Sequence, residues 1–227
     1  MTPAPSAYHQ RVAAAKRALI VQAATKLFLE LGYDRASLAR VADSAGVSKA
    51  TLFKQFPTKA ALFDAIIIDS WAENDVAADV PSAGDLTAGL TTLGRRYATL
   101  LSQPEMVDLF RIVIAELPRF PELARAHFAQ GKMPYFESVR SYLLAERDAG
   151  AADIADPEMA ATQFLGMISN YLFWPSLLLP DWTVAPARTA AVVEEAVRTM
   201  VARYGTDAHH PNREVITAPA VENAPDC

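Results

Sequence analysis

The chain has 227 residues, of which 52% are hydrophobic and 21% are charged, a composition that excludes a mainly disordered polypeptide. Its single cysteine, Cys227, excludes an intramolecular disulfide, and its N-terminus lacks the uninterrupted apolar core of a signal peptide, so we expect a cytoplasmic protein.

The charge is unevenly distributed along the chain, whose formal net charge is −5. Residues 1–59 contain nine Lys and Arg against three Asp and Glu, a net charge of +6, so the remaining residues carry −11. A basic end on an acidic remainder indicates that only the first part meets a polyanion. A chance unevenness of solvated side chains is the alternative.

Apolar residues recur every three to four positions and alternating strand patterns are almost absent, so we predict an all-α fold of about nine helices. The first predicted helix ends at Gly32. A short second helix starts after the capping residue Ser37 and ends at Gly46. A short third helix is capped by Ser48 and stopped by Pro57, with Leu52, Phe53 and Phe56 expected on its inward side.

Longer helices are predicted for the rest of the chain. They lie near residues 59–78, 85–102, 104–117, 121–148, 156–178 and 186–204. Gly131 and Pro134 are candidate interruptions of the helix over 121–148. The apolar stretch 164–179 is shorter than the ~20 residues that span a bilayer, so we predict a buried helix and no membrane contact. Residues 205–227 have little apolar periodicity and are expected to form a disordered tail.

Two short helices joined by a Gly-containing turn, with another helix packed across them, form a helix-turn-helix module. Ala42, Ala45 and Gly46 allow close approach of the two helices, and the third helix is then free to present a polar side. That side carries Lys49, Thr51, Lys54 and Gln55. A DNA major groove accepts one such helix.

Residues 36–63, ASLARVADSAGVSKATLFKQFPTKAALF, and the upstream segment AATKLFLELGY at residues 23–33 carry a family pattern. Together they resemble the DNA-binding domain of tetracycline-repressor (TetR) type transcriptional regulators over roughly residues 12–64. The resemblance implies a DNA-binding domain at residues 10–58 and a helical domain at residues 59–204 that binds an effector and dimerises. It implies no enzymatic activity, and the sequence contains no catalytic, metal-binding or cofactor-binding motif.

The resemblance also assigns the residues expected to contact DNA: Ser37, Arg40, Ser48, Lys49, Ala50, Thr51, Phe53, Lys54, Gln55 and Lys59. Phe53 replaces the family's usual Tyr and so lacks a hydroxyl for a phosphate contact, which Lys54 is a candidate to restore. Gln55 replaces the usual His and can read adenine or meet phosphate. Ala50 replaces the usual Gly and offers a methyl group to thymine.

The remaining candidate residues lie in the helical domain. Those expected to line an effector cavity are Trp71, Phe110, Tyr135, Phe136, Asn170, Phe173 and Trp174, with plain core packing as the alternative for each aromatic ring. For His127 a surface position is equally compatible. Those expected at a dimer interface are Phe164, Val193, Val197, Met200 and Tyr204, with packing onto their own domain as the alternative.

The predicted function is that of a ligand-responsive transcriptional regulator. We expect a homodimeric repressor that leaves a palindromic operator in double-stranded DNA when a small apolar or aromatic effector binds. One alternative is a helical small-molecule-binding protein or enzyme whose helix-turn-helix no longer engages DNA. A second is a DNA-organising protein that responds to no ligand.

Overall fold

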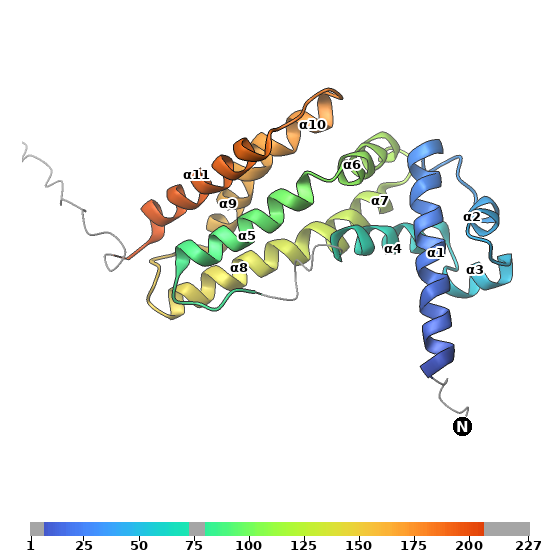
Figure 1. Cartoon of the computed structure of the whole chain (residues 1–227), viewed down its shortest axis with the longest axis horizontal. Helices are drawn as coiled ribbons and strands as arrows, with labels where there is room; N and C mark the ends of the chain where they lie inside the picture. Colours follow the sequence, from blue (N-terminus) through green and yellow to red (C-terminus); the bar gives the residue numbers. More distant parts are fainter. Residues whose placement is uncertain (1–6, 73–79, 207–227) are drawn as a thin grey trace, which may run out of the picture.

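The computed structural model of the chain describes residues 7–72 and 80–206, and these residues confirm the all-α prediction (Figure 1). The helices are α1 (Ala7–Leu31), α2 (Leu38–Ser44), α3 (Lys49–Gln55), α4 (Lys59–Ala72), α5 (Leu86–Leu101), α6 (Pro104–Glu116), α7 (Pro121–Ala126), the π-helical segment η1 (His127–Lys132), α8 (Met133–Asp148), α9 (Pro157–Leu172), α10 (Trp174–Leu178) and α11 (Pro186–Tyr204).

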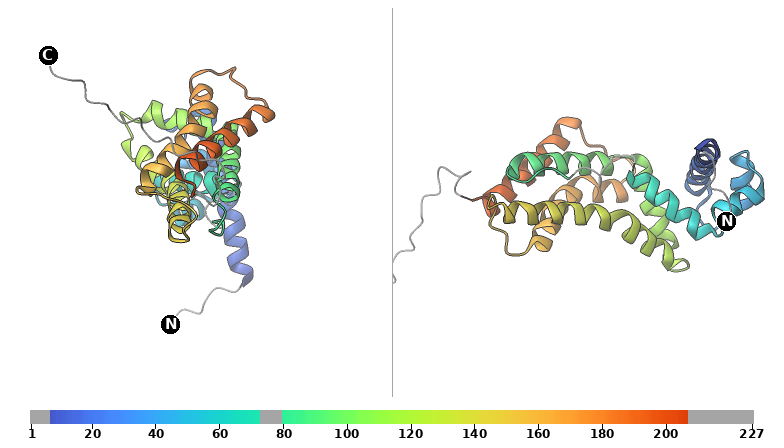
Figure 2. Two further views of the ribbon diagram at one scale, coloured as in Figure 1. Left: turned by 90° about the vertical axis from the view of Figure 1, so that its left-hand side faces the viewer. Right: turned by 90° about the horizontal axis from the view of Figure 1, so that it is seen from below.

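The molecule is elongated, with helices α1 to α3 at one end (Figure 1). We call these three helices the head and the helices from α5 onward the body; α4 joins the two. Four long body helices, α5, α8, α9 and α11, run along the long axis and pack against one another. The second view in Figure 2 shows the head at the end of this bundle, where α4, α6 and α7 meet it.

The head helices begin and end where the sequence supplies caps and glycines. Gly32 and Gly46 adopt positive φ angles of 80° and 65°, which glycine tolerates without strain, and so reverse the chain after α1 and α2. Ser37 and Ser48 cap α2 and α3 with their side-chain oxygens. Phe28 lies at the centre of the head, fully buried.

Two long predicted helices are each interrupted, and proline explains both breaks. The segment over 121–148 comprises α7, η1 and α8, because Pro134 lacks the N–H that an α-helical bond to Gln130 requires. The segment over 156–178 divides at Phe173, because Pro175 cannot continue the bonding of α9. The last residues predicted for the 59–78 helix and nearly all of the predicted tail lie outside the described residues.

The apolar stretch 164–179 is divided between α9 and α10, and its larger side chains enter the bundle. Phe164, Ile168 and Leu172 are buried there. Within residues 7–72 and 80–206, no helix combines the length and the apolar character needed to cross a membrane.

A buried carboxylate ties the far end of α8 to the turn before α5. Glu146 is completely buried and accepts hydrogen bonds from the Gly84 N–H, at 3.0 Å, and from the Tyr142 hydroxyl. The same hydroxyl lies 2.9 Å from the Asp85 carbonyl oxygen. Burial, followed by the hydrogen bond to Glu146, raises the pKa of Tyr142. We call Glu146, Tyr142, Gly84 and Asp85 the distal polar network, and each of its buried polar groups has a partner.

Candidate nucleic-acid interface

Helix α3 is held at the end of the molecule by its apolar side. Leu52 and Phe56 are fully buried, and the Val47 N–H donates to the Ala42 carbonyl oxygen at 3.0 Å, which closes the turn between α2 and α3. The buried pair fixes the rotation of the helix, so its remaining positions face outward.

The outward side of α3 carries most of the predicted DNA-binding residues. Lys49, Ala50 and Lys54 are exposed, whereas Thr51 and Gln55 are half-buried. Arg40 is exposed on α2. Phe53, which the periodicity placed on the inward side, is 47% exposed instead. That prediction was wrong because Leu52 and Phe56 alone fill the inward side of so short a helix. An exposed aromatic ring therefore lies between two lysines.

The three predicted hydroxyl groups are engaged within the protein. Ser37 Oγ accepts from the Arg40 N–H at 3.3 Å, and Ser48 Oγ accepts from the Thr51 N–H at 3.1 Å. The Ser48 and Thr51 hydroxyls lie 2.9 Å apart. In this structure, these groups orient α2 and α3.

Lys59 lies away from the outward side of α3. Its Nζ donates to the Asp34 carbonyl oxygen at 3.0 Å and lies 4.4 Å from the centre of the Tyr33 ring. Burial lowers the pKa of Lys59, against the opposing effect of the Asp34 and Glu116 carboxylates. The ammonium group thus stabilises the loop between α1 and α2.

Helix α1 adds basic residues that the motif analysis did not single out. The Arg17 guanidinium lies 4.5 Å from the centre of the Phe56 ring, so this part of α1 runs beside α3. Arg11 and Lys16 are exposed on the same helix. Only the overall charge count of residues 1–59 signals them in the sequence.

The head contacts the body through the loop after α1. Arg119 Nη1 lies 2.9 Å from Asp34 Oδ2, and the Asp34 N–H donates to Glu116 Oε1 at 3.3 Å. The Tyr33 and Phe120 rings pack edge to face at 5.0 Å. We call these five residues the head–body contact. Its partners are more than 80 residues apart in the chain, so no local pattern signals them.

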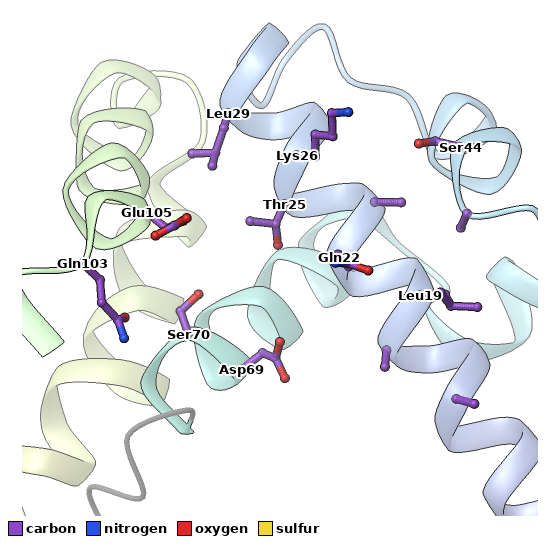
Figure 3. A pocket seen from close by; sticks show the side chains of 14 residues that line it. Leu19, Gln22, Thr25, Lys26, Leu29, Ser44, Asp69, Ser70, Gln103 and Glu105 are labelled. Atoms are coloured by element: carbon purple, nitrogen blue, oxygen red, sulfur yellow. The ribbon is translucent and has the colours of Figure 1, made fainter.

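An open groove of about 1210 Å³ separates α1 from the rest of the molecule on another side (Figure 3). Leu19 and Leu29 of α1 line it, together with Asp69 of α4 and with Gln103 and Glu105 at the start of α6. The groove thus lies between α1 of the head and the parts of α4 and α6 that face it.

Three of the predicted cavity residues converge on His127. Phe110 lies edge to face on His127 at 4.0 Å and on Phe173 at 4.6 Å, and Trp71 approaches His127 at 6.0 Å. His127 is 5% exposed, so the surface position left open for it is wrong. We call Trp71, Phe110, His127 and Phe173 the His127 cluster.

Of the other predicted cavity residues, Trp174 borders this cluster, since its ring lies edge to face on Phe173 at 6.2 Å. Tyr135 is buried, stacks on Tyr97 at 5.1 Å and donates its hydroxyl to the Leu93 carbonyl, so its polar group is used structurally. Phe136 is half-buried, and Asn170 and Trp174 are exposed.

The five residues predicted for a dimer interface lie in the core of the single chain. They are all buried: Phe164, Val193, Val197, Met200 and Tyr204. Their helical spacing marks the face of α11 and of α9 that packs against α5. These residues therefore follow the alternative given for them, which was packing onto their own domain. A second subunit cannot reach them, so this prediction is corrected. Met159 and Asn170 are exposed on the outer side of α9.

Both parts of the chain match models of known protein families. Residues 20–66 match the model described as bacterial regulatory proteins of the tetR family. Residues 88–206, more than half of the chain, match the C-terminal domain of AefR-like transcriptional repressors.

Several individual proteins are similar over most of the chain. The structure of a TetR-family transcriptional regulator from Mesorhizobium loti MAFF303099 has a TM-score of 0.75 and 28% identity, covering 86% of this chain and 98% of that one. The flavonoid-responsive regulator FrrA has a TM-score of 0.70 and 29% identity, covering 85% and 98%. The HTH-type transcriptional regulator Rv1556 of Mycobacterium tuberculosis is 25% identical over 181 residues, 78% of this chain and 84% of its own length.

Proposed function

We propose that this chain, which belongs to the TetR family of bacterial transcriptional regulators, is a repressor that leaves a palindromic operator when a small effector binds. Its relatives are regulators and not enzymes. The observation that carries the proposal is the outward side of α3, where Lys49 and Lys54 flank an exposed Phe53 on a helix anchored by two buried residues. We assign DNA binding to residues 10–58, and effector binding and dimerisation to residues 59–204.

Base reading is proposed for the start of α3. Lys49, Ala50 and Thr51 lie where the N-terminal residues of a recognition helix meet base edges. Arg40 and Lys54 are assigned to phosphates, which fix the position of the protein on DNA. Phe53 and Gln55 are also proposed to contact DNA. Ser37 and Ser48 are proposed to hold α2 and α3 in place, and Lys59 the loop between α1 and α2.

A homodimer would present two copies of α3 to two half-sites. Half-sites about 34 to 36 Å apart, one turn of DNA, match a two-fold symmetric dimer. The outer sides of α9 and α11 are proposed as the dimer surface, in place of the buried residues first predicted. Met159, which is 51% exposed, is an apolar candidate for its centre.

The effector is proposed to act through the head–body contact. It must bind the conformation released from DNA more tightly than the bound one, since equal affinity for both shifts nothing. Two helices connect the His127 cluster to the head. Helix α4 contributes Trp71 and follows α3 after residues 56–58, and α6 contributes Phe110 and leads to Arg119 and Phe120. The aromatic cluster and the flavonoid response named for the similar regulator FrrA both support an aromatic effector.

A gel-shift experiment tests the proposal with DNA from upstream of the protein's own gene. We expect a complex that resists competitor DNA, weakens with salt and loses about 1–3 kcal/mol of binding free energy in Lys49→Ala. Lys26→Ala is the matched control, because it removes the same charge from α1 and not from α3. Absence of any competitor-resistant complex at low salt would contradict the proposal and favour a helical ligand-binding protein without a DNA site.

A further inference from the structure

The His127 cluster contains three buried polar atoms that make no hydrogen bond with the described part of the chain: Trp71 Nε1, His127 Nδ1 and His127 Nε2. Trp71 and His127 are 7% and 5% exposed. More than nine-tenths of buried polar groups in proteins have a partner, and each exception calls for an explanation. Three such atoms on two adjacent rings indicate a place where hydrogen bonds are made with something other than the described part of the chain.

The surrounding residues are aromatic and come from separate elements. Trp71 lies on α4, Phe110 on α6 and His127 on η1, while Phe173 follows α9. Phe110 contacts both His127 and Phe173, and it is the half-buried member of the cluster. A displacement of the Phe110 ring is therefore the shortest way to expose the nitrogens of His127.

The backbone beside Trp71 has an unusual form. His127 to Lys132 form a π-helix, a rare form that occurs frequently at functional sites. A Cβ atom on Gly131 would clash with Trp71 Nε1, so the indole packs directly against this backbone. The position of Trp71 relative to His127 is thus set by the backbone of η1.

The protonation state of His127 defines what the pair can recognise. Burial, and then the nearby Lys132 cation, lowers the pKa of His127 to about 4, so its imidazole is neutral at physiological pH. A neutral imidazole has one N–H donor and one acceptor nitrogen, and the indole of Trp71 adds a second donor.

The geometry points to Trp71 and His127 as the binding site for the hydroxyl group of an uncharged aromatic effector, an inference that rests on the proposed effector response. A phenolic hydroxyl donates to the acceptor nitrogen of His127 and accepts from the indole N–H. The rings of Phe110 and Phe173 pack on the effector's aromatic body. A carboxylate fits less well, because it offers no donor to the imidazole and is costly to bury without an ion pair.

Binding at this site acts on the head directly. The hydroxyl contacts α4 through Trp71 and η1 through His127, so an effector seated there separates or rotates these two elements. Because only residues 56–58 separate α4 from α3, that movement reaches the proposed DNA-binding surface without passing through the long helices of the bundle.

Fluorescence of Trp71 provides the test. The chain has three tryptophans, and Trp174→Phe with Trp182→Phe leaves Trp71 as the sole reporter. The probes are phenol, naphthol and a hydroxyflavone, and each is compared with its parent compound, which lacks the hydroxyl group. Naphthoate tests a carboxylate in place of the hydroxyl group. We expect at least one hydroxylated probe to change Trp71 emission and to bind at least about tenfold more tightly than its parent.

Two substitutions at His127 separate binding from structure. His127→Leu should weaken the hydroxylated probe at least about tenfold, whereas His127→Gln, which keeps a donor and an acceptor, should stay within about threefold. The melting temperature of His127→Leu without probe should stay level or rise, because an unpaired buried polar group is removed. A lower melting temperature with unchanged probe affinity would overturn the inference and assign His127 a structural role.

The remaining outcomes also support or overturn the inference. Tighter binding of naphthoate than naphthol would overturn the hydroxyl assignment, and so would equal binding of every probe and its parent or no response to any probe. The gel shift with the same variants separates this inference from the proposed function. If His127→Leu still binds DNA but the probe no longer releases it, both the proposed function and this inference are supported. If the unmodified chain does not bind DNA, only the proposed function is rejected.

Discussion

The body contains two buried polar sites that differ in their hydrogen bonding. In the distal polar network, the Glu146 carboxylate is completely buried and accepts from Tyr142 and Gly84. In the His127 cluster, near the head, both imidazole nitrogens are buried and have no partner among the described residues. Buried polar groups that pair with one another stabilise a fold, whereas unpaired ones destabilise it and are available for a ligand.

The position of each site matches this difference. The distal polar network joins the end of α8 to the turn before α5, far from the head (Figure 1). The His127 cluster joins α4 to α6, the two helices that lead to the head. The described part of the body therefore has paired polar groups at one end and unpaired polar atoms at the end nearer the head.

Removal of the buried carboxylate should have the largest effect on stability. Glu146→Ala leaves the Gly84 N–H without its acceptor and opens a cavity, so we expect a loss of about 3 kcal/mol in the free energy of unfolding. Urea denaturation measures it. Glu137→Ala, which removes a half-buried α8 carboxylate paired with Arg140, is the matched control and is expected to stay within about 0.5 kcal/mol. Equal effects of the two substitutions would show that the distal polar network is not structural.

A methyl group at position 131 should disturb the other site. Gly131→Ala places its Cβ against the Trp71 indole, so we expect a loss of about 2 kcal/mol in the free energy of unfolding and a shift in Trp71 fluorescence. Ala129→Ser adds similar bulk at an exposed position of η1 and should leave both quantities unchanged. Wild-type fluorescence in Gly131→Ala would refute the close packing of Trp71 on η1.

The two sites should also differ in their response to acid. The pKa of His127 is lowered from 6.5 to about 4, so the unfolded chain binds a proton that the folded chain does not. Stability should therefore fall by up to about 1.4 kcal/mol per pH unit as the pH drops from about 6.5 to 4. Denaturation of wild type and His127→Leu across this pH range isolates the part of the stability loss that is due to His127. The variant should lose only the stability that the other titrating groups account for. Parallel curves would contradict a neutral buried imidazole.

The smallest stability effects are expected at the head–body contact. The Asp34 and Arg119 side chains are largely exposed, so Arg119→Ala should cost less than about 1 kcal/mol. Phe120→Ala removes packing on the buried Tyr33 ring and should cost more, about 1–2 kcal/mol. The decisive measurement is operator affinity with and without effector. Phe120→Ala should reduce the difference between these two affinities more than Arg119→Ala does. The reverse order would indicate that the Asp34–Arg119 ion pair couples effector binding to operator binding.

The head was predictable from the sequence because its determinants are local. Ser37, Gly46 and Ser48 set helix ends and a turn within 12 residues of one another, and Leu52 and Phe56 set the rotation of α3. The error at Phe53 arose because apolar character was taken as evidence of burial in a helix too short to bury three large apolar side chains.

The body was predictable as helices but not as a site. The spacing of apolar residues in α11 correctly marked a packed face. That spacing alone could not distinguish packing in the subunit's own core from packing against a second subunit, so Val193 and Met200 were assigned to the wrong surface. The rings that contact His127 come from residues 71 and 110, residue 173 contacts residue 110, and only the fold brings them together. Aromatic composition identified three of the four cluster members and left the only titratable one undecided.

The π-helical turn of η1 has a consequence for how this regulator could diversify. An α-helix advances about 100° per residue, whereas a π-helical turn winds more widely and takes up one extra residue without rotating the preceding helix relative to α8. Deleting Ala129 should therefore restore the ordinary pitch of this turn and leave His127 facing Trp71 and Phe110. A lineage could change the length of this turn, and with it the backbone that packs on Trp71, while the helices on either side keep their contacts.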